Sequence, residues 1–365
     1  MKKIRYISLF LVLCLCVGLC ACGSSKDTAA SASDVTSSPA PTPEAKPEPT
    51  PAPTPEATPE PAPTVDSEVP VNIMVLNGTT GFGMAKLIND SAEGKAALNY
   101  KVSVETDASN VTAGLINGSV DIAALPTNAA SVVYNKTKGA VQLLALNTKG
   151  VLYVVVNSEK ETVTSMADLK GKTVYAPAQN PTFIFSYLCS QSGLEVGKDI
   201  VIDNSYAQPA DLRTALAAGE VDIAVLPEPM VTIARAANDK LAYALNLTQV
   251  WDEVAPEGSL VQGCVVVRKA FAEEHPAEVA KFLEEYEASI DFLSADAEAA
   301  GAAIEASGVF ANGKVAQKAL PKCNVCFIAG EDMKAAMADF LDIMFSVAPA
   351  SIGGAVPAED FYYIP

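Results

Sequence analysis

Apolar residues follow two patterns along the chain: short continuous runs, and longer stretches with an apolar residue every three or four positions. The runs are typical of buried strands and the longer stretches of amphipathic helices. From residue 69 onward the two alternate, which predicts an α/β fold with mainly parallel sheets and helices on their faces. The expected strands cover residues 71–76, 100–105, 120–125, 141–145, 150–156, 199–204, 221–226 and 262–267, and residues 168–175 are expected to form a turn followed by a strand. The main expected helices cover residues 111–117, 127–134, 184–191, 211–218, 231–238, 278–293 and 333–344.

One helix–Gly–strand–Pro unit occurs twice. Its copies read GSVDIAALP from Gly118 and GEVDIAVLP from Gly219. The glycine suits the left-handed residue that ends a helix, and the proline ends the strand. The copies begin at Gly118 and Gly219, which is too wide a spacing for a solenoid repeat and therefore predicts two related lobes. Asp121 and Asp222 stand at the strand starts, so we expect structural tasks for both and functional tasks for the residues after each proline.

The order of elements places the two lobes in the sequence. We expect the chain to cross to the second lobe near Asn157 and to return in the strand at 262–267. The first lobe is therefore predicted at 69–157 plus 259–365, and the second at 158–258. Two crossing segments would form a hinge between them.

The first 68 residues have a different composition from the rest. A basic start precedes an apolar stretch at 6–18 that is short for a transmembrane helix, which predicts an export signal at 1–21. The following LCACGSS resembles the bacterial lipobox, in which the cysteine, here Cys22, becomes the lipidated N-terminus. Soluble secretion is the alternative. Residues 22–68 are rich in Pro, Thr and Glu and predict a disordered tether that holds the protein on the outer face of the cell membrane.

Composition excludes several classes of function. The chain of 365 residues has a net charge of -18, and no basic stripe for nucleic acid. His275 is the single histidine, which removes most triad and histidine–metal chemistry. Cys323 and Cys326 have no second pair that would complete a zinc site, so a disulfide and two free thiols both remain open. We expect a monomer without a cofactor or metal.

Four segments in order carry a family resemblance: the glycine-rich turn at 77–83, VDIAALP, DLKGKTV from Asp168, and GEVDIAVLPEP from Gly219. Together they resemble the type 2 periplasmic-binding-protein fold. More narrowly, residues 70–365 look like ABC-transporter substrate-binding proteins for nitrate, sulfonates, taurine and the thiamine pyrimidine precursor.

The resemblance implies two lobes that close on a small solute, with an ABC permease and ATPase as partners. A ligand-sensing surface lipoprotein is the alternative. Some relatives of the pyrimidine-precursor branch are enzymes that depend on an active-site His and a Cys-rich iron motif. This chain places neither in the expected cleft, so we expect no enzyme.

Ligands of open α/β sheets sit outside the carboxyl ends of the strands. Four such ends are polar here, and the start of the return strand lies near them. The predicted ligand-binding residues are Asn77, Thr79, Thr80, Phe82, Thr127, Asn128, Gln179, Thr182, Phe183, Glu228 and Gln262.

Glu228 bears on the charge of the solute. A carboxylate in the cleft would oppose an anion, and the four loops contain no Arg or Lys. We therefore expect a neutral or cationic solute, with an aromatic part if Phe82 stacks on it. The alternative is that Glu228 caps the following helix and points to solvent.

Overall fold

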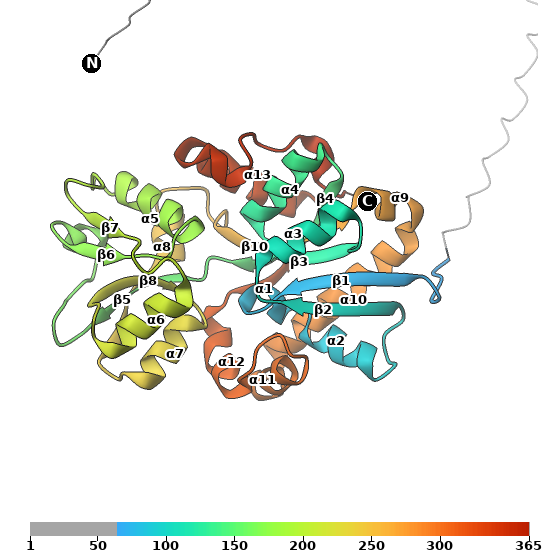
Figure 1. Cartoon of the computed structure of the whole chain (residues 1–365), viewed down its shortest axis with the longest axis horizontal. Coiled ribbons are helices and arrows are strands. Elements are labelled where there is room, and N and C mark those ends of the chain that lie inside the picture. The colour runs from blue at the N-terminus through green and yellow to red at the C-terminus, as the bar shows by residue number, and fades with distance from the viewer. Residues whose placement is uncertain (1–63, 365) are drawn as a thin grey trace, which may run out of the picture. The chain divides into compact units, whose positions relative to one another are not determined.

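Two β-sheets organise the protein, and each is covered by helices to form a lobe (Figure 1). The computed structural model describes residues 64–364. The expected signal peptide at 1–21, Cys22 and most of the expected tether at 22–68 lie outside the described residues. No helix in the described part of the chain is both long and apolar enough to cross a membrane.

The first lobe is built on a six-stranded sheet with the order β11-β4-β10-β3-β1-β2. Along β1 and β10, alternate side chains enter separate apolar clusters on the two faces of the sheet. The strands of this sheet are β1 (Pro70–Leu76), β2 (Asn99–Glu105), β3 (Ile122–Pro126), β4 (Val141–Lys149), β10 (Val261–Arg268) and β11 (Val325–Ile328).

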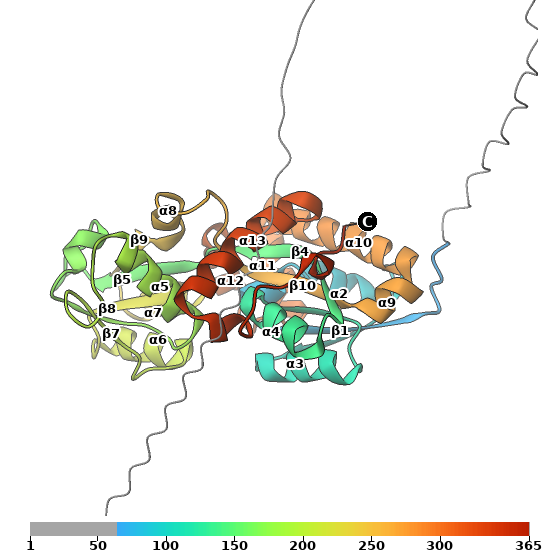
Figure 2. The same cartoon turned by 90° about the horizontal axis from the view of Figure 1, so that it is seen from above.

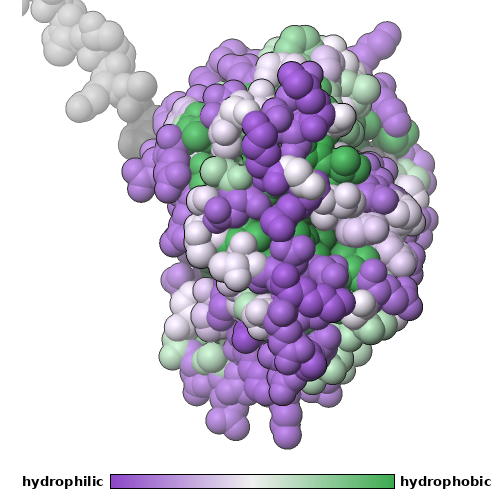
Figure 3. All heavy atoms as spheres, turned by 90° about the vertical axis from the view of Figure 1, so that its left-hand side faces the viewer, coloured by the Kyte–Doolittle hydropathy of each residue, from purple (hydrophilic) through white to green (hydrophobic). Residues whose placement is uncertain are grey.

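The second lobe is built on a five-stranded sheet with the order β7-β6-β8-β5-β9. This lobe lies at the left of Figure 1, and Figure 3 shows its outer end as a mostly hydrophilic surface with small separate hydrophobic areas. Its strands are β5 (Leu152–Asn157), β6 (Thr173–Tyr175), β7 (Val201–Asp203), β8 (Ile223–Pro227) and β9 (Leu241–Asn246).

Most strands of each sheet run in the same direction, as expected, but both sheets also contain antiparallel pairs. The pairs β1–β2, β1–β3, β6–β7 and β6–β8 are parallel, whereas β4, β5 and β10 pair antiparallel with their neighbours. The reason lies in the crossings. Strands β5 and β10 enter a lobe from the other one, so they run opposite to the strands that end at the boundary between the lobes.

The first crossing comes earlier than predicted. Because β5 pairs with β8 and β9, Leu152–Asn157 belongs to the second lobe, and the chain crosses at Gly150 and Val151 rather than near Asn157. A side chain at Gly150 would bring a Cβ within 2.3 Å of Thr248 Oγ1 and 2.6 Å of Leu260 Cδ2. The crossing therefore requires a glycine, because the segment around the second crossing packs directly against it.

Helices cover both faces of the first sheet, with α13 lying across β4 and β10 on one of them (Figure 2). On the opposite face, Phe282 and Tyr286 of α10 share a core with Ile73 and Val265. The helices of this lobe are α1 (Thr79–Phe82), α2 (Ala85–Ala92), α3 (Ala108–Asn117), α4 (Thr127–Thr137), α9 (Lys269–Glu274), α10 (Pro276–Ala295), α11 (Ala297–Ala306), α12 (Gly313–Ala319) and α13 (Gly330–Val347).

The second lobe has fewer helices, and Trp251 anchors one of them in the core. Short 3-10 helices complete the chain at Met166–Leu169, Leu320–Lys322, Pro349–Ile352 and Glu359–Phe361. The α-helices of this lobe are α5 (Asn180–Gln191), α6 (Pro209–Ala218), α7 (Met230–Ala237) and α8 (Leu247–Asp252).

The repeated unit folds as predicted in both lobes. Gly118 and Gly219 end α3 and α6 in the left-handed conformation, with φ of 79° and 78°. Asp121 is buried, accepts hydrogen bonds from the backbone and side chain of Asn72, and pairs with Arg268 at 2.6 Å. Asp222 instead forms a half-exposed ion pair with Lys160. Both acids hold strands in place, as expected.

Candidate functional site

A small cavity lies where the two lobes meet, and we call it the cleft pocket. Its volume is about 220 Å³. It lies at the carboxyl ends of β1, β3 and β4 and at the amino end of α5, which is the place that open α/β sheets use for ligands. It is lined by Thr79, Thr80, Pro126, Asn128, Thr148, Val151, Ala178, Gln179, Asn180, Pro181 and Gln262.

Five predicted site residues meet in this pocket although they come from four separate parts of the sequence. They are Thr79, Thr80, Asn128, Gln179 and Gln262. Every residue that lines the pocket in the described part of the chain is uncharged. The pocket therefore offers hydroxyl and amide groups without a full charge to balance a charged ligand.

Two of these residues also bind backbone groups around the boundary between the lobes. The Thr79 hydroxyl, from the first lobe, donates to the carbonyl of Glu228 in the second lobe at 2.9 Å. Gln262 Oε1 accepts a hydrogen bond of 2.7 Å from the backbone N–H of Val151 at the crossing. The same side chains therefore line the pocket and bind backbone groups at the boundary between the lobes.

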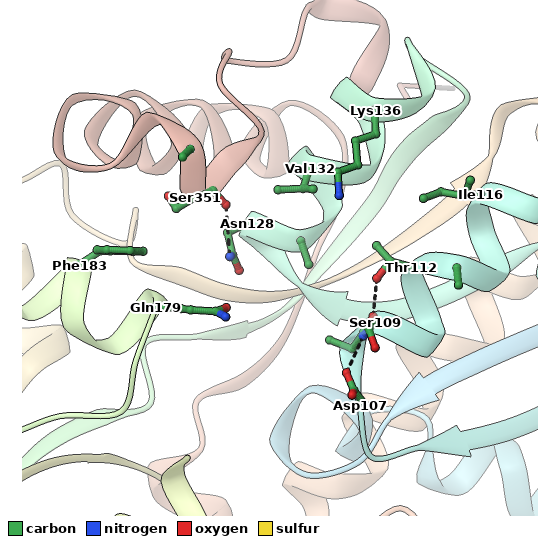
Figure 4. A pocket seen from close by; sticks show the side chains of 14 residues that line it. Asp107, Ser109, Thr112, Ile116, Asn128, Val132, Lys136, Gln179, Phe183 and Ser351 are labelled. Carbon is green, nitrogen blue, oxygen red and sulfur yellow. Dashed lines mark hydrogen bonds between the residues drawn. The ribbon is translucent and has the colours of Figure 1, made fainter. Parts of the chain in front are cut away.

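Asn128 connects three parts of the molecule. Its Oδ1 accepts a hydrogen bond from Asn180 Nδ2 of the second lobe at 2.9 Å. Its Nδ2 donates to the carbonyl of Ser351, near the C-terminus, at 3.4 Å (Figure 4). Asn180 Oδ1 is buried without a partner among the described residues, so a residue that lines the pocket carries an unsatisfied acceptor.

Gln179 has an unusual backbone conformation. It precedes α5 with φ of 67° and ψ of -129°, a region that non-glycine residues rarely adopt. Strain of this kind is concentrated at ligand sites, where the surrounding structure holds it in place. The exposed Gln179 side chain lies at the start of the helix, where it lines the cleft pocket and also the larger cavity that Figure 4 draws.

Phe82 and Thr127 do not reach the pocket, which corrects two predictions. Phe82 is fully buried and packs edge-to-face on Phe310, with ring centroids 5.9 Å apart. Thr127 is also fully buried, and its hydroxyl donates to the carbonyl of Val261 at 2.8 Å. Both follow a strand end, but the helix that starts there turns these side chains into the core.

Asn77 and Thr182 lie in the expected loops yet outside the lining. The Asn77 backbone N–H donates to the carbonyl of Glu105 at 2.8 Å, which extends the pairing of β1 and β2. The Thr182 hydroxyl donates to the carbonyl of Pro177 at 2.7 Å and accepts from Asn204 Nδ2 at 2.6 Å. These residues shape the loops rather than face the cavity.

Glu228 caps a helix, but it points neither to the cleft pocket nor to solvent. Its side chain accepts hydrogen bonds from the backbone N–H and hydroxyl of Thr232, both 3.1 Å, and from the hydroxyl of Tyr243. Only 2% of the residue is exposed. Burial and then the hydrogen bond to Glu228 raise the pKa of Tyr243. Burial and the nearby Glu228 and Cys323 raise the pKa of Tyr153 to about 12.

Thr148 and Asn180 line the pocket without having been predicted. Thr148 was missed because β4 continues to Lys149, beyond the apolar run that marked its expected end. Asn180 lies in a loop whose neighbours were named, and its position at the first turn of α5 could have drawn attention to it. In the described chain Cys323 and Cys326 are free thiols, which resolves the two alternatives left by the sequence.

A larger cavity of about 690 Å³ adjoins the cleft pocket (Figure 4). Asn128 and Gln179 line both cavities, and Phe183, another predicted residue, lines this one. The larger cavity is formed by one face of α3, one face of α4, the start of α5 and the segment around Ser351. Of the predicted residues, six therefore line at least one of the two cavities.

Two α/β lobes joined by two crossing segments, with a polar cavity between them, have the architecture of the type 2 periplasmic-binding-protein fold. A crystal structure of an ABC transporter protein from Parabacteroides distasonis has this fold, with a TM-score of 0.68 and 21% identity over 82% of this chain and 99% of that chain. The periplasmic aliphatic sulphonate binding protein SsuA of Escherichia coli matches with a TM-score of 0.64 and 15% identity, over 81% and 92% of the two chains.

The alkanesulfonate-binding protein SsuA of Xanthomonas axonopodis, solved with bound MOPS, matches with a TM-score of 0.56 and 16% identity, over 77% of this chain and 97% of that one. No curated protein matches the chain significantly. The family described as NMT1/THI5 like matches residues 95–300, more than half of the chain. The chain belongs to this family.

Proposed function

We propose that the protein is an extracytoplasmic solute-binding protein that captures one small molecule in the cleft pocket and delivers it to an ABC importer. The observation that supports this proposal most strongly is that five predicted residues from separate segments line one uncharged pocket between the lobes. The solved structures of the same fold, which include sulfonate-binding proteins, support this role. The lipid anchor at Cys22 and the membrane location rest on the sequence.

The solute that fits best is neutral and polar. The uncharged lining offers no cationic side chain to balance an anionic solute and no carboxylate to balance a cationic one. Because Glu228 is already bonded to Thr232 and Tyr243, the argument for a cation loses its support. An N–H or O–H group on the solute would give the unpaired Asn180 Oδ1 a hydrogen-bond donor. The amino ends of α4 and α5 carry partial positive charge, which favours a hydrogen-bond acceptor on the solute next to this donor.

We propose that the protein binds its solute without a chemical reaction, because the side chains that could take part in catalysis lie outside the cleft pocket. His275 stands before α10, at 3.9 Å from Glu278, and does not line the pocket. Cys323 is buried, and burial together with the nearby Glu228 raises the pKa of its thiol. A thiol of that kind is a poor nucleophile.

Calorimetry with three ligands of equal chain length tests the solute class. Propanamide, ethylamine and ethanesulfonate carry a neutral, a cationic and an anionic head on the same ethyl group. We expect propanamide to bind and the two ions to bind at least about tenfold more weakly, since neither finds a counter-charge. Tight binding of the sulfonate with no binding of the amide would contradict the proposal.

A pair of glutamine variants controls for effects on the fold. Gln179→Ala removes an amide that lines the pocket, whereas Gln249→Ala removes an exposed amide on α8, away from it. Only the first should weaken propanamide binding. Equal weakening by both variants would show that the ligand binds outside the cleft pocket.

A further inference from the structure

The 690 Å³ cavity beside the cleft pocket has a lining of a different kind, and we call it the groove. Apolar side chains make up much of it: Ala113, Ile116, Ala129, Val132, Phe183 and Ala350. On α3 and on α4 the lining residues recur at helical spacing, so each helix turns one face to the groove. Two charged residues, Asp107 and Lys136, also line it, and they lie apart from each other (Figure 4).

Ile116 shows that the groove is not closed by the protein itself. Its side chain is 51% exposed, more than any other large apolar side chain in residues 64–364. Val132 and Phe183 are half-buried in the same lining. Apolar side chains that share a concave surface usually indicate a binding site, because burial of that surface is favourable.

The groove adjoins the cleft pocket. Asn128 and Gln179 line both cavities, so these two side chains lie at the boundary between them. Asn128 is held in place by Asn180 on the pocket side and by the carbonyl of Ser351 on the groove side. Ser351 Oγ is buried without a partner among the described residues, as Asn180 Oδ1 is in the pocket.

Size separates the tasks of the two cavities. Ligand sites of proteins usually have volumes of about 300–1,000 Å³. The cleft pocket, at about 220 Å³, lies below that range, whereas the groove, at about 690 Å³, lies within it. The pocket has room for a polar head, and the groove has room for a larger apolar part that follows it.

We infer that the protein binds an amphiphilic solute, with a neutral polar head in the cleft pocket and an alkyl chain or apolar ring in the groove. This inference rests on the proposed function and narrows it to one class of solute. Ile116 and Val132 contact the apolar part, and Asn128 lies where head and chain meet. Transport of a purely polar molecule would leave the groove unused.

A series of primary amides tests the inference on the full chain. Propanamide, pentanamide and octanamide share one head and differ only in chain length. If the groove takes the chain, each methylene should tighten binding by up to about fourfold, because apolar area leaves water. Equal affinity for propanamide and octanamide would overturn the inference and leave the proposed function intact.

Matched variants place the chain in the groove. Ile116→Asp puts a charge into the groove and Ala113→Leu fills it, so both should abolish the gain in affinity with chain length and weaken octanamide binding far more than propanamide binding. Val201→Asp is the control, because Val201 is 49% exposed on β7 and lines neither cavity. A loss of propanamide and octanamide binding in equal proportion in the groove variants would overturn the inference.

Native mass spectrometry of the purified protein covers the case in which no amide binds. A retained solute with an apolar chain or ring, lost in Ile116→Asp, supports the inference, and an entirely polar retained solute overturns it. No retained solute and no amide binding would overturn the proposed function as well.

A synthetic peptide of residues 39–63 tests whether a segment of the chain itself occupies the groove. If the peptide displaces octanamide but not propanamide, the groove belongs to that segment and the inference is overturned.

Discussion

The two copies of the repeated unit end in the same place of their lobes but have different tasks there. After β3, the chain places Asn128 between two cavities, hydrogen-bonded to Asn180 of the second lobe. After β8, it buries Glu228, whose side chain holds Thr232 at the start of α7. The backbone carbonyl of Glu228, rather than its carboxylate, contacts the opposite lobe through Thr79.

The strand starts differ in the same manner. Asp121 is buried and tied to Asn72 and Arg268, whereas Asp222 forms one half-exposed ion pair with Lys160. A repeated sequence therefore predicts a repeated backbone and not a repeated side-chain environment. The neighbours decide the environment, and they come from elements that the repeat does not contain.

The largest expected effect concerns the two aspartates. Asp121→Ala leaves Arg268 and the N–H of Asn72 without their partner, and we expect a loss of about 2–4 kcal/mol in the free energy of unfolding. Asp222→Ala should cost about 1 kcal/mol or less, since exposed ion pairs contribute little. Urea unfolding of both variants measures the difference. Equal losses would mean that the two sites are equivalent after all.

Glu228 should matter for stability more than for binding. Glu228→Ala removes the cap of α7 and leaves the hydroxyl of Tyr243 without its acceptor, which we expect to cost about 1–3 kcal/mol. Solute affinity should change by less than about twofold, because the carboxylate does not line the cleft pocket. Calorimetry with propanamide checks this, and a large loss of affinity in a folded variant would return Glu228 to the site.

Asn128 should show the opposite balance. Asn128→Ala removes a group that lines both cavities and the hydrogen bond to Asn180, so affinity for the solute should fall by about tenfold. Unfolding stability should change by about 1 kcal/mol or less, because the side chain is only partly buried. The same two assays used for Glu228 give the result. A stable variant with unchanged affinity would contradict the proposed site.

The smallest expected effect lies in the second lobe at Asp168. Hydrogen bonds from the backbone and hydroxyl of Thr164, and then from Ser165, lower the pKa of this carboxyl from 3.8 to about 2. A pKa lowered by folding stabilises the folded state above the unfolded value and is lost as the pH falls toward the folded value. Asp168→Asn should thus be less stable than wild type near neutral pH.

Between pH of about 4 and 2 that difference should shrink toward zero. Urea midpoints of both proteins across this range, together with the NMR titration of the Asp168 carboxyl, measure it. A titration midpoint at the ordinary 3.8 would show that the turn before β6 does not hold the carboxylate.

The sequence predicted the elements better than their pairing. Apolar periodicity located β1, α4, α10 and most other elements, and Gly118 marked the end of α3 correctly. It did not show that β5 belongs to the second lobe, because an apolar run has the same appearance in either sheet. It also did not show that β10 runs antiparallel to β3 and β4, because the direction of a strand depends on where the chain crosses between the lobes.

The site was predicted in outline and missed in detail for a similar reason. Thr79 and Phe82 lie on one short helix, but Thr79 lines the pocket and the ring of Phe82 lies in the core. A loop sequence shows that polar groups stand at a strand end without showing which of them point inward. The groove was not foreseen, because it needs α3, α4 and the distant Ser351 to come together.

The central claim is that one solute occupies the cleft pocket between the lobes. Native mass spectrometry of the purified wild-type chain, Gln179→Ala and Gln249→Ala tests it most directly. We predict one small molecule per chain in wild type and in Gln249→Ala, with a clear reduction in Gln179→Ala. Absence of any bound molecule in wild type even after addition of propanamide, or equal retention by all three proteins, would contradict the claim.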